Sequence, residues 1–164
     1  MDENFPLAAL KDAGYDAAFM GQKSYNGVAI LSKYPIEDVQ KNFLDDDDES
    51  PRRLIAATVK GIRIVNTYIP NGSELWSDKF TFKLDWLQRL RRLFDETCDS
   101  NKDVLLCGDL NTRPIEAPYA ALAEDFVDAW ETVGAGNGYT FPSQTPNRRI
   151  DYFADTASHS GICL

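Results

Sequence analysis

The amino-acid sequence predicts one domain of mixed α/β class, and three observations carry that prediction. Two β-rich runs at 54–59 and 62–68 are separated by Lys60-Gly61, which is the spacing of a tight hairpin. From about Lys79 a helical pattern follows, with apolar residues three and four positions apart. The compact apolar run at 104–107 is typical of a central strand. Hairpins mixed with strand-helix-strand passages favour an α/β or α+β arrangement.

The composition is that of a folded protein with an acidic surface. The chain has 164 residues, 43% hydrophobic and 26% charged, which is close to the average for globular domains and long enough to bury a core. We find no repeat and no linker, so residues 1–164 are expected to form a single domain. The net charge of −9 disfavours loose binding to nucleic acid or anionic membranes. A polyanionic substrate would have to be held by local arginines or by metal ions.

Two features of the sequence bear on its compartment. No apolar run approaches the ~20 residues that cross a bilayer, and the first residues lack the basic and apolar regions of a signal peptide. The three cysteines, Cys98, Cys107 and Cys163, are odd in number and form no CxxC pair, which fits reduced thiols. We therefore expect a cytoplasmic protein with no membrane partner.

The first predicted elements are a helix and two strands. Polar residues and Pro6 precede residues 7–11, and Gly14 follows them, which supplies a cap, a first-turn proline and a terminating glycine for a short helix. Residues 15–20 and 27–31 are predicted as short strands. The second is almost wholly apolar, so we expect both of its faces to be buried.

The middle of the chain is predicted as an exposed loop, a hairpin and a helix. The run Asp45–Glu49 is too charged to pack and lacks the spacing of a calcium loop, so it is expected to be solvated. The helix from about Lys79 is expected to bury Leu84, Leu87, Leu90 and Phe94 as one stripe, with its arginines mostly off that stripe. After the strand at 104–107 the pattern is looser and ends in a glycine-rich turn at 134–138.

The segment Gly108-Asp109-Leu110-Asn111 is the most suggestive site. It follows an apolar strand, and alternation would turn Asp109 and Asn111 to the same side. A carboxylate and a carboxamide in one cleft suit magnesium-assisted phosphoester chemistry, in which the carboxylate activates water or binds the metal and the amide orients a phosphate or water. The plain alternative is a strand end whose Asp and Asn cap a turn.

Three further residues are candidates, each with a plainer alternative. Tyr68, at a second strand end, can donate to a phosphate oxygen or can be a core aromatic with its hydroxyl at the rim. Asp151 in Arg148-Arg149-Ile150-Asp151-Tyr152 can orient a histidine, or can belong to a local Arg/Asp ion pair. The only histidine, His159, is expected to be solvated near the C-terminus.

In their order along the chain these motifs resemble the endonuclease/exonuclease/phosphatase superfamily and, within it, the exonuclease III branch of abasic-site DNA repair nucleases. The resemblance runs from about Asp2 to Tyr152. Its segments are GQKSYNGVAILSKYP (21–35), RRLI (52–55), NTYIPNG (66–72), the helix start at 79–87, CGDLNTRP (107–114) and RRIDYF (148–153).

The resemblance implies a four-layer α/β sandwich of the DNase I-like type, with its cleft at the strand ends. It also implies a monomer that hydrolyses phosphodiester bonds in double-stranded DNA with Mg²⁺ or Mn²⁺. Asp109 would activate or orient the attacking water and bind the metal. Asn111 and Tyr68 would contact the scissile phosphate, and Asp151 would orient a histidine.

Substrate binding is assigned by the resemblance to two further residues, Arg53 and Asn71. Arg53 follows the acidic loop and would support the DNA-facing loop, and Asn71 follows the tyrosine segment.

The chain also departs from this pattern. Members of the branch begin with two strands that carry an active-site asparagine and a metal-binding glutamate, and they end with a Ser-Asp-His motif; neither has a counterpart here. We therefore expect a partial domain, without its first and last strands and with impaired activity. The segment 139–146 lacks the branch's aromatic-rich character and resembles the wider phosphodiesterases. The alternatives are a phosphatase or phosphodiesterase acting on lipid head groups or nucleotides, and a DNA-binding domain without turnover.

Overall fold

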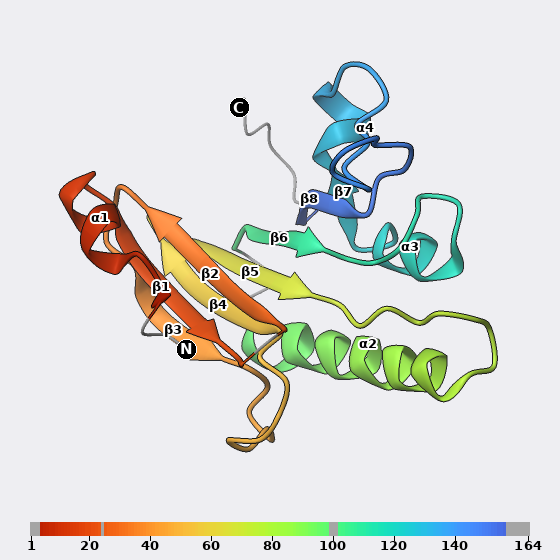
Figure 1. The fold of residues 1–164 in the computed structure, drawn as a ribbon, viewed down its shortest axis with the longest axis horizontal. Helices are drawn as coiled ribbons and strands as arrows, with labels where there is room; N and C mark the ends of the chain where they lie inside the picture. The colour runs from red at the N-terminus through yellow and green to blue at the C-terminus, as the bar shows by residue number, and fades with distance from the viewer. Residues whose placement is uncertain (1–3, 24, 99–101, 157–164) are drawn as a thin grey trace.

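The structure is a computed structural model that describes residues 4–23, 25–98 and 102–156 (Figure 1). In chain order its elements are α1 (Leu7–Asp12), β1 (Asp16–Gly21), β2 (Gly27–Ser32), β3 (Glu37–Lys41), β4 (Leu54–Val59), β5 (Ile62–Tyr68), α2 (Asp78–Thr97), β6 (Val104–Asp109), α3 (Ala117–Leu122), β7 (Phe126–Asp128), α4 (Ala129–Val133) and β8 (Asp151–Thr156).

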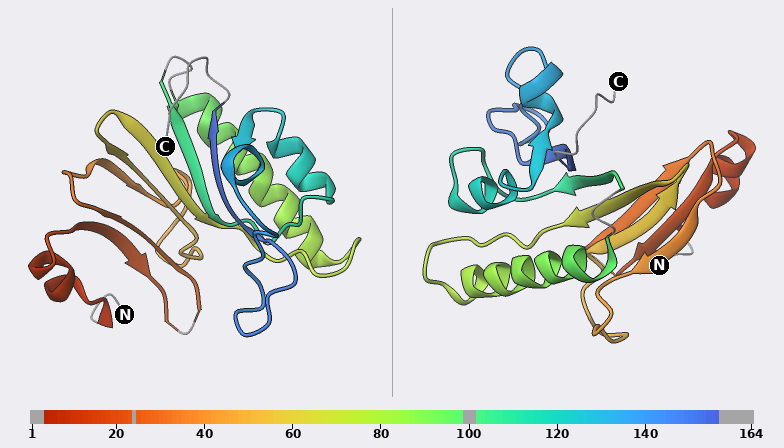
Figure 2. Two further views of the ribbon diagram at one scale, coloured as in Figure 1. Left: turned by 90° about the horizontal axis from the view of Figure 1, so that it is seen from above. Right: turned by 180° about the vertical axis from the view of Figure 1, so that it is seen from behind.

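Two sheets form the centre of the fold. The larger has six strands in the order β3-β4-β5-β6-β8-β7, and the smaller is the antiparallel pair β1-β2. The smaller sheet packs on β4 and β5 from one side, and α2 covers the opposite face (Figure 2). Helix α1 lies against β1. This layered arrangement confirms the predicted α/β class.

Strand β4 separates two hydrophobic cores. Leu54 and Ala56 face α2, while Ile55 and Ala57 face the smaller sheet, and all four are almost fully buried. A continuous apolar run is what such a strand requires, because both of its faces are covered. The predicted hairpin to β5 through Lys60-Gly61 is confirmed, with a register that runs from Leu54 opposite Thr67 to Val59 opposite Ile62.

The expectation that β2 is buried on both faces is wrong. Val28, Ile30 and Ser32 are buried, whereas Leu31 is 47% exposed. Strand β2 belongs to the outer sheet, so only the face against β4 and β5 is covered. An apolar run of this length does not distinguish a covered strand from a half-covered one.

The buried stripe of α2 is rotated from the predicted one. The helix buries Lys83, Trp86, Leu90 and Leu93, and Leu84 is 40% exposed. Leu87 and Phe94 pack at the border of the core. The stripe begins with a lysine, which a pattern built from apolar residues alone does not include.

Strand β3 was not predicted from the sequence. Its residues, EDVQK, are mostly exposed, and it pairs with β4 at the edge of the sheet through an irregular register. Edge strands often carry charged side chains, which removes the apolar alternation on which recognition depends. Earlier in the chain, α1 lies within one residue of its prediction, but its N-cap is Pro6 and no side chain caps it.

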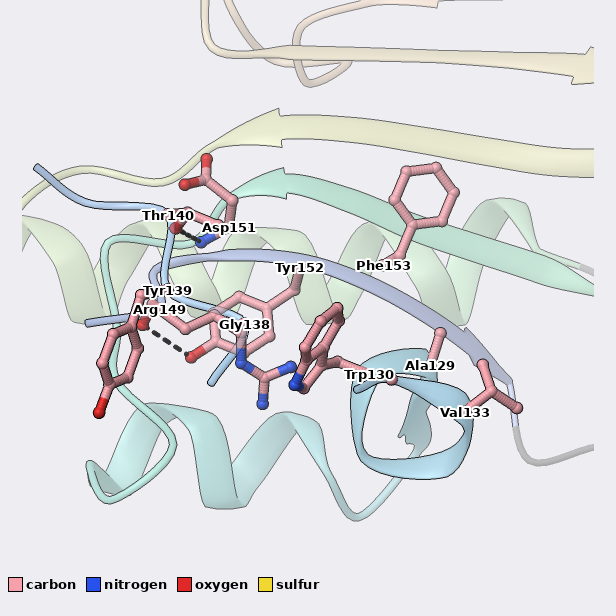
Figure 3. A pocket seen from close by; sticks show the side chains of 11 residues that line it. Ala129, Trp130, Val133, Gly138, Tyr139, Thr140, Arg149, Asp151, Tyr152 and Phe153 are labelled. Atoms are coloured by element: carbon pink, nitrogen blue, oxygen red, sulfur yellow. Dashed lines mark hydrogen bonds between the residues drawn. The ribbon is translucent and has the colours of Figure 1, made fainter. Parts of the chain in front are cut away.

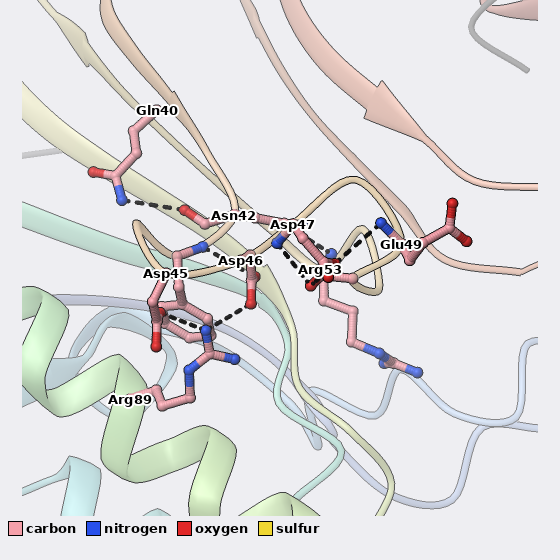
Figure 4. A network of polar contacts seen from close by, with 10 residues as sticks. Gln40, Asn42, Asp45, Asp46, Asp47, Glu49, Arg53 and Arg89 are labelled. Carbon is pink, nitrogen blue, oxygen red and sulfur yellow. Dashed lines mark hydrogen bonds and ion pairs between the residues drawn. The ribbon is translucent and has the colours of Figure 1, made fainter.

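The acidic loop after β3 is exposed as predicted, with one exception. Arg89 of α2 forms ion pairs of 2.6 Å with both Asp45 and Asp46 (Figure 4). The Asp46 side chain is only 11% exposed, so part of this loop packs against α2. Arg89 holds the pKa of the Asp45 carboxyl below its usual range. In the described ranges, no helix is long and apolar enough to cross a membrane.

Candidate active site

A cleft of about 890 Å³ lies where β5 and β6 end, and it gathers four of the predicted residues. These strands run parallel, with Tyr68 opposite Asp109, so their carboxyl ends meet at one edge of the sheet. Such an edge is where open α/β sheets usually bind ligands. Tyr68, Asn71, Asp109 and Asn111 all line the cleft.

Asp109 is the half-buried carboxylate of the cleft. Its Oδ1 accepts the backbone N–H of Asn111 at 2.7 Å. Burial raises the pKa of the Asp109 carboxyl, and the negative charge of Asp151 raises it further. The hydrogen bond from Asn111 and the positive charges of Lys83 and Arg53 oppose this rise. A carboxylate whose pKa is raised is a stronger proton acceptor.

Asn111 reaches the cleft by a route that the sequence did not predict. It has a φ of +47°, beyond the end of β6, so strand alternation does not place it. Asparagine tolerates this left-handed conformation better than most residues. Its Nδ2 donates to the Ile69 carbonyl at 2.9 Å, which ties the end of β6 to the segment after β5. One amide N–H is used there, and the second is left for a substrate oxygen.

Lys83 is a residue of this site that sequence reasoning missed. Its ammonium donates to the Asn111 carbonyl and to Thr112 Oγ1, both at 2.7 Å, and to the Leu110 carbonyl at 3.4 Å. The side chain is 3% exposed. Burial lowers the pKa of Lys83, while the charges of Glu116 and Asp109 raise it. The available signal was its helical spacing to Trp86 and Leu90.

Arg53 supports Tyr68 and does not line the cleft. Its guanidinium lies over the Tyr68 ring, 4.5 Å from the centroid, and its Nη1 donates to the Tyr68 carbonyl at 3.0 Å. Burial lowers the pKa of Arg53. Asn71, which does line the cleft, accepts the Ser73 N–H through Oδ1 at 3.0 Å.

Asp151 stands opposite Asp109 in the antiparallel register of β6 and β8. It lines a neighbouring cavity of about 580 Å³ together with aromatic residues such as Trp130 and Tyr139 (Figure 3). Its backbone N–H donates to Thr140 Oγ1 at 3.3 Å. The two carboxylates are thus cross-strand neighbours, although the cleft itself does not include Asp151.

A local Arg/Asp ion pair was the plainer alternative for the segment 148–152. An arginine of this segment does form an ion pair, but its partner lies outside the segment. Arg149 is buried and forms an ion pair of 2.7 Å with Asp128, 21 residues earlier in the chain. Tyr119 also donates to Asp128, at 2.9 Å. His159 and Cys163 lie outside the described residues.

The donor atoms of the site fit a hard divalent cation. Asp109, Asp151 and Asn111 offer carboxylate and amide oxygens, which Mg²⁺ and Mn²⁺ prefer. The residues that the structure describes hold no group of three or more His, Cys, Asp or Glu side chains that would enclose an ion. Magnesium is usually bound by one or two carboxylates together with substrate phosphates, so the donor set fits that mode.

Curated relatives of this chain are DNA repair nucleases. The chain is 29% identical to exodeoxyribonuclease III of Haemophilus influenzae over 118 residues, which cover 69% of this chain and 44% of that protein. It is 30% identical to a DNA-(apurinic or apyrimidinic site) endonuclease of Arabidopsis thaliana over 99 residues, covering 56% of this chain and 26% of that protein. The chain therefore spans less than half the length of these curated relatives.

Solved structures of similar proteins share the fold. A 3′ phosphatase from Neisseria bound to a product DNA hairpin superposes with a TM-score of 0.80 at 29% identity, covering 94% of this chain and 72% of that one. An AP endonuclease from Archaeoglobus fulgidus gives the same TM-score of 0.80, the same identity of 29% and the same coverage of 94% and 72%. The model of the Endonuclease/Exonuclease/phosphatase family matches residues 1–153, and the chain belongs to that family.

Proposed function

We propose that this protein hydrolyses phosphodiester bonds in double-stranded DNA with Mg²⁺ or Mn²⁺, in the manner of exodeoxyribonuclease III and abasic-site endonucleases. The observation that carries the proposal is the convergence of Tyr68, Asn71, Asp109 and Asn111 in one cleft at the ends of two parallel strands. The names of its relatives support DNA as the substrate.

Asp109 is the residue that prepares the attacking water. The Asn111 N–H fixes one carboxylate oxygen, which leaves the other to accept a proton or to hold the metal. Its raised pKa makes this carboxylate a stronger proton acceptor than an exposed one. Asp109 would hold a divalent ion, which when bound would supply positive charge for the phosphate oxygens.

The scissile phosphate is held by neutral donors. The Tyr68 hydroxyl and the second N–H of Asn111 donate to its oxygens, and Arg53 keeps the Tyr68 ring in place by stacking on it. Asn71 extends the substrate contacts along the same wall. Asp151 would orient a histidine that the described residues do not supply, a role supported by the family resemblance and by its place beside Asp109. We further propose that the protein acts as a monomer in the cytoplasm.

The test is Asp109→Asn, which keeps the shape of the side chain and removes its charge. Cleavage of a duplex that contains an abasic site, measured with Mg²⁺, is expected to fall by about 10²–10⁴-fold, the contribution of a positioned acid/base group. Asp85→Asn is the matched control, because Asp85 is an exposed carboxylate on α2 outside the cleft. Cleavage by D109N within a few-fold of the unsubstituted protein would overturn the assignment.

A phosphatase acting on small phosphoesters is the second candidate. It is favoured by the net charge of −9, which opposes binding of a long polyanion. Competition between duplex DNA and a small phosphoester distinguishes the two. Salt-sensitive DNA binding without metal-dependent product would instead indicate a binding domain that does not turn over.

A further inference from the structure

The cationic side chains that line the cleft differ in whether their positive charge already has a partner. Lys83, Arg113 and Arg148 all contribute to the lining. The ammonium of Lys83 is buried and donates to three oxygens of the segment after β6. Arg113 is paired with Glu116, Nε to Oε1, at 2.8 Å. The Lys83 ammonium is therefore engaged by acceptors of the protein, and the positive charge of Arg113 is offset by a neighbouring carboxylate.

Arg148 is different. Among the described residues its guanidinium forms no ion pair and no side-chain hydrogen bond, and its side chain is exposed. Its contact is the ring of Phe141, whose centroid lies 4.7 Å from the guanidinium carbon. Stacking on an aromatic face uses the face of a guanidinium and leaves the N–H groups in its plane available.

The backbone fixes the position of this pair. The Phe141 N–H donates to the Arg148 carbonyl at 3.0 Å, and the Arg148 N–H donates to the Phe141 carbonyl at 3.2 Å. These bonds close the loop 142–147 at its base and hold both residues at the cleft. Arg148 is therefore presented by a closed loop and an aromatic face, which reduces the conformational entropy that it loses on binding a ligand.

The charge of the whole protein indicates what this arginine binds. A net charge of −9 repels polyanions, so attraction must come from local cations with free donors. Guanidinium groups match phosphate oxygens with two parallel hydrogen bonds. Arg148 comes from the segment before β8, whereas Tyr68 and Asn71 come from the end of β5, so it extends the cleft in another direction.

We propose that Arg148, held on Phe141, binds a backbone phosphate of the DNA strand next to the scissile one, and that the cleft thereby selects polynucleotides over small phosphoesters. This inference rests on the proposed function and deepens it by naming a second phosphate subsite. It makes Phe141 a positioning residue, because Phe141 acts through the guanidinium.

The experiment measures binding of a short fluorescein-labelled DNA duplex by fluorescence anisotropy, using the full chain in EDTA so that no turnover occurs. Arg148→Gln is expected to weaken binding about tenfold at moderate salt and to reduce the slope of log Kd against log salt by about one, the effect of losing one phosphate contact. Arg148→Lys keeps the slope and recovers part of the affinity. Phe141→Leu weakens binding by less than R148Q does and keeps the slope.

Arg91→Gln is the matched control. Arg91 is an exposed arginine of α2 that pairs with Asp95 and Asp125 and does not line the cleft, so its loss should leave the affinity and the slope unchanged. Thermal unfolding of each variant confirms that it folds. Hydrolysis of bis(p-nitrophenyl) phosphate, a small phosphodiester that spans no second phosphate, should fall by a smaller factor in R148Q than DNA binding does.

The outcomes separate this inference from the proposed function. If the unsubstituted protein binds DNA and R148Q binds it with the same affinity and slope, the second phosphate subsite is refuted and the proposed function stands. If R148Q lowers DNA binding and hydrolysis of the small phosphodiester by the same factor, the selectivity for polynucleotides is refuted. No DNA binding by the unsubstituted protein refutes the DNA substrate and this inference together.

Discussion

Lys83 holds the segment after β6 in place through three oxygen acceptors. Two of them are backbone carbonyls, of Leu110 and Asn111, so the lysine fixes the main chain immediately after Asp109. Buried carbonyls that lose a donor cost free energy, because no water replaces the lost bond. The geometry of the cleft therefore depends on a residue of α2 that was not predicted as a site residue.

Lys83→Met tests this dependence. The change keeps much of the stem and removes the donors, so the free energy of unfolding is expected to fall by about 1–3 kcal/mol, the cost of an unsatisfied buried group. Urea unfolding measures it. Lys79→Met, at an exposed position of the same helix, should change stability by less than about 0.5 kcal/mol. Equal stability of the two variants would contradict the supporting role.

Sequence patterns predicted the residues of the cleft better than their contacts. Tyr68, Asp109 and Asn111 were found because each lies in a short motif at a strand end, which is local information. The ion pair of Arg149 could not be predicted from its own segment, since its partner Asp128 lies 21 residues away. Lys83 was missed because its acceptors come from 27 to 29 residues further along the chain.

At the scale of elements, local signals again decided what could be predicted. The β4–β5 hairpin was predicted to the residue, because its turn and its apolar runs are contiguous in the sequence. Strand β3 was missed and the outer face of β2 was misjudged, because edge position and face coverage depend on how the sheets pack. The helix stripe was rotated for the same reason.

The pairing of β5 with β6 depends on Gly108. It has a φ of +118°, and a Cβ placed there would lie 2.1 Å from the Thr67 carbonyl oxygen on β5. Gly108→Ala is therefore expected to reduce the free energy of unfolding by more than about 3 kcal/mol, because the new Cβ would clash with the backbone of β5 and the positive φ would also be strained.

Gly61→Ala is the control for the strain alone. Gly61 has a φ of +84°, and a Cβ placed there would meet no atom within 4 Å, so its substitution should cost about 1–2 kcal/mol. Urea unfolding of both variants separates the clash from the strain. A smaller loss in G108A than in G61A would contradict the close approach of the two strands.

Considered as a whole molecule, the two sheets are joined by more than apolar packing. Asn66 of β5 donates through Nδ2 to the Ala29 carbonyl of β2 at 2.8 Å, which fixes how one sheet lies on the other. Cys107, in the neighbouring strand β6, is buried. Its reactivity therefore reports whether the six-stranded sheet stays folded around it.

Burial raises the pKa of the Cys107 thiol from 9.0 to about 11. Because the thiolate is the reactive form, alkylation of Cys107 by iodoacetamide at about pH 8 is expected to be roughly a hundredfold slower in the folded protein than in urea. Mass spectrometry of the labelled peptides measures both rates. The thiol of Cys107 keeps its proton to a higher pH in the folded state than in the unfolded state. The protonated thiol therefore contributes fully to the free energy of unfolding below pH 9, and this contribution is lost as the pH rises to about 11.

Cys98 gives an internal comparison, since it is half-buried and should react before Cys107. Rapid labelling of Cys107 in the folded protein would contradict its burial in the six-stranded sheet.

The parallel junction of β5 and β6 also bears on how the protein folds. The crossover through α2 separates the two strands along the chain, and the hydrogen bond between Asn111 and Ile69 spans 42 residues. Contacts between residues so far apart in sequence form slowly, because the entropy of closing the intervening loop is lost before the contacts stabilise the structure. The β4–β5 hairpin is local and can form early, whereas the cleft comes into being only when β6 docks. Formation of the cleft should therefore coincide with the rate-limiting step of folding. In refolding followed by hydrogen exchange, protection of the amides at the cleft and the rate-limiting step should appear in the same kinetic phase.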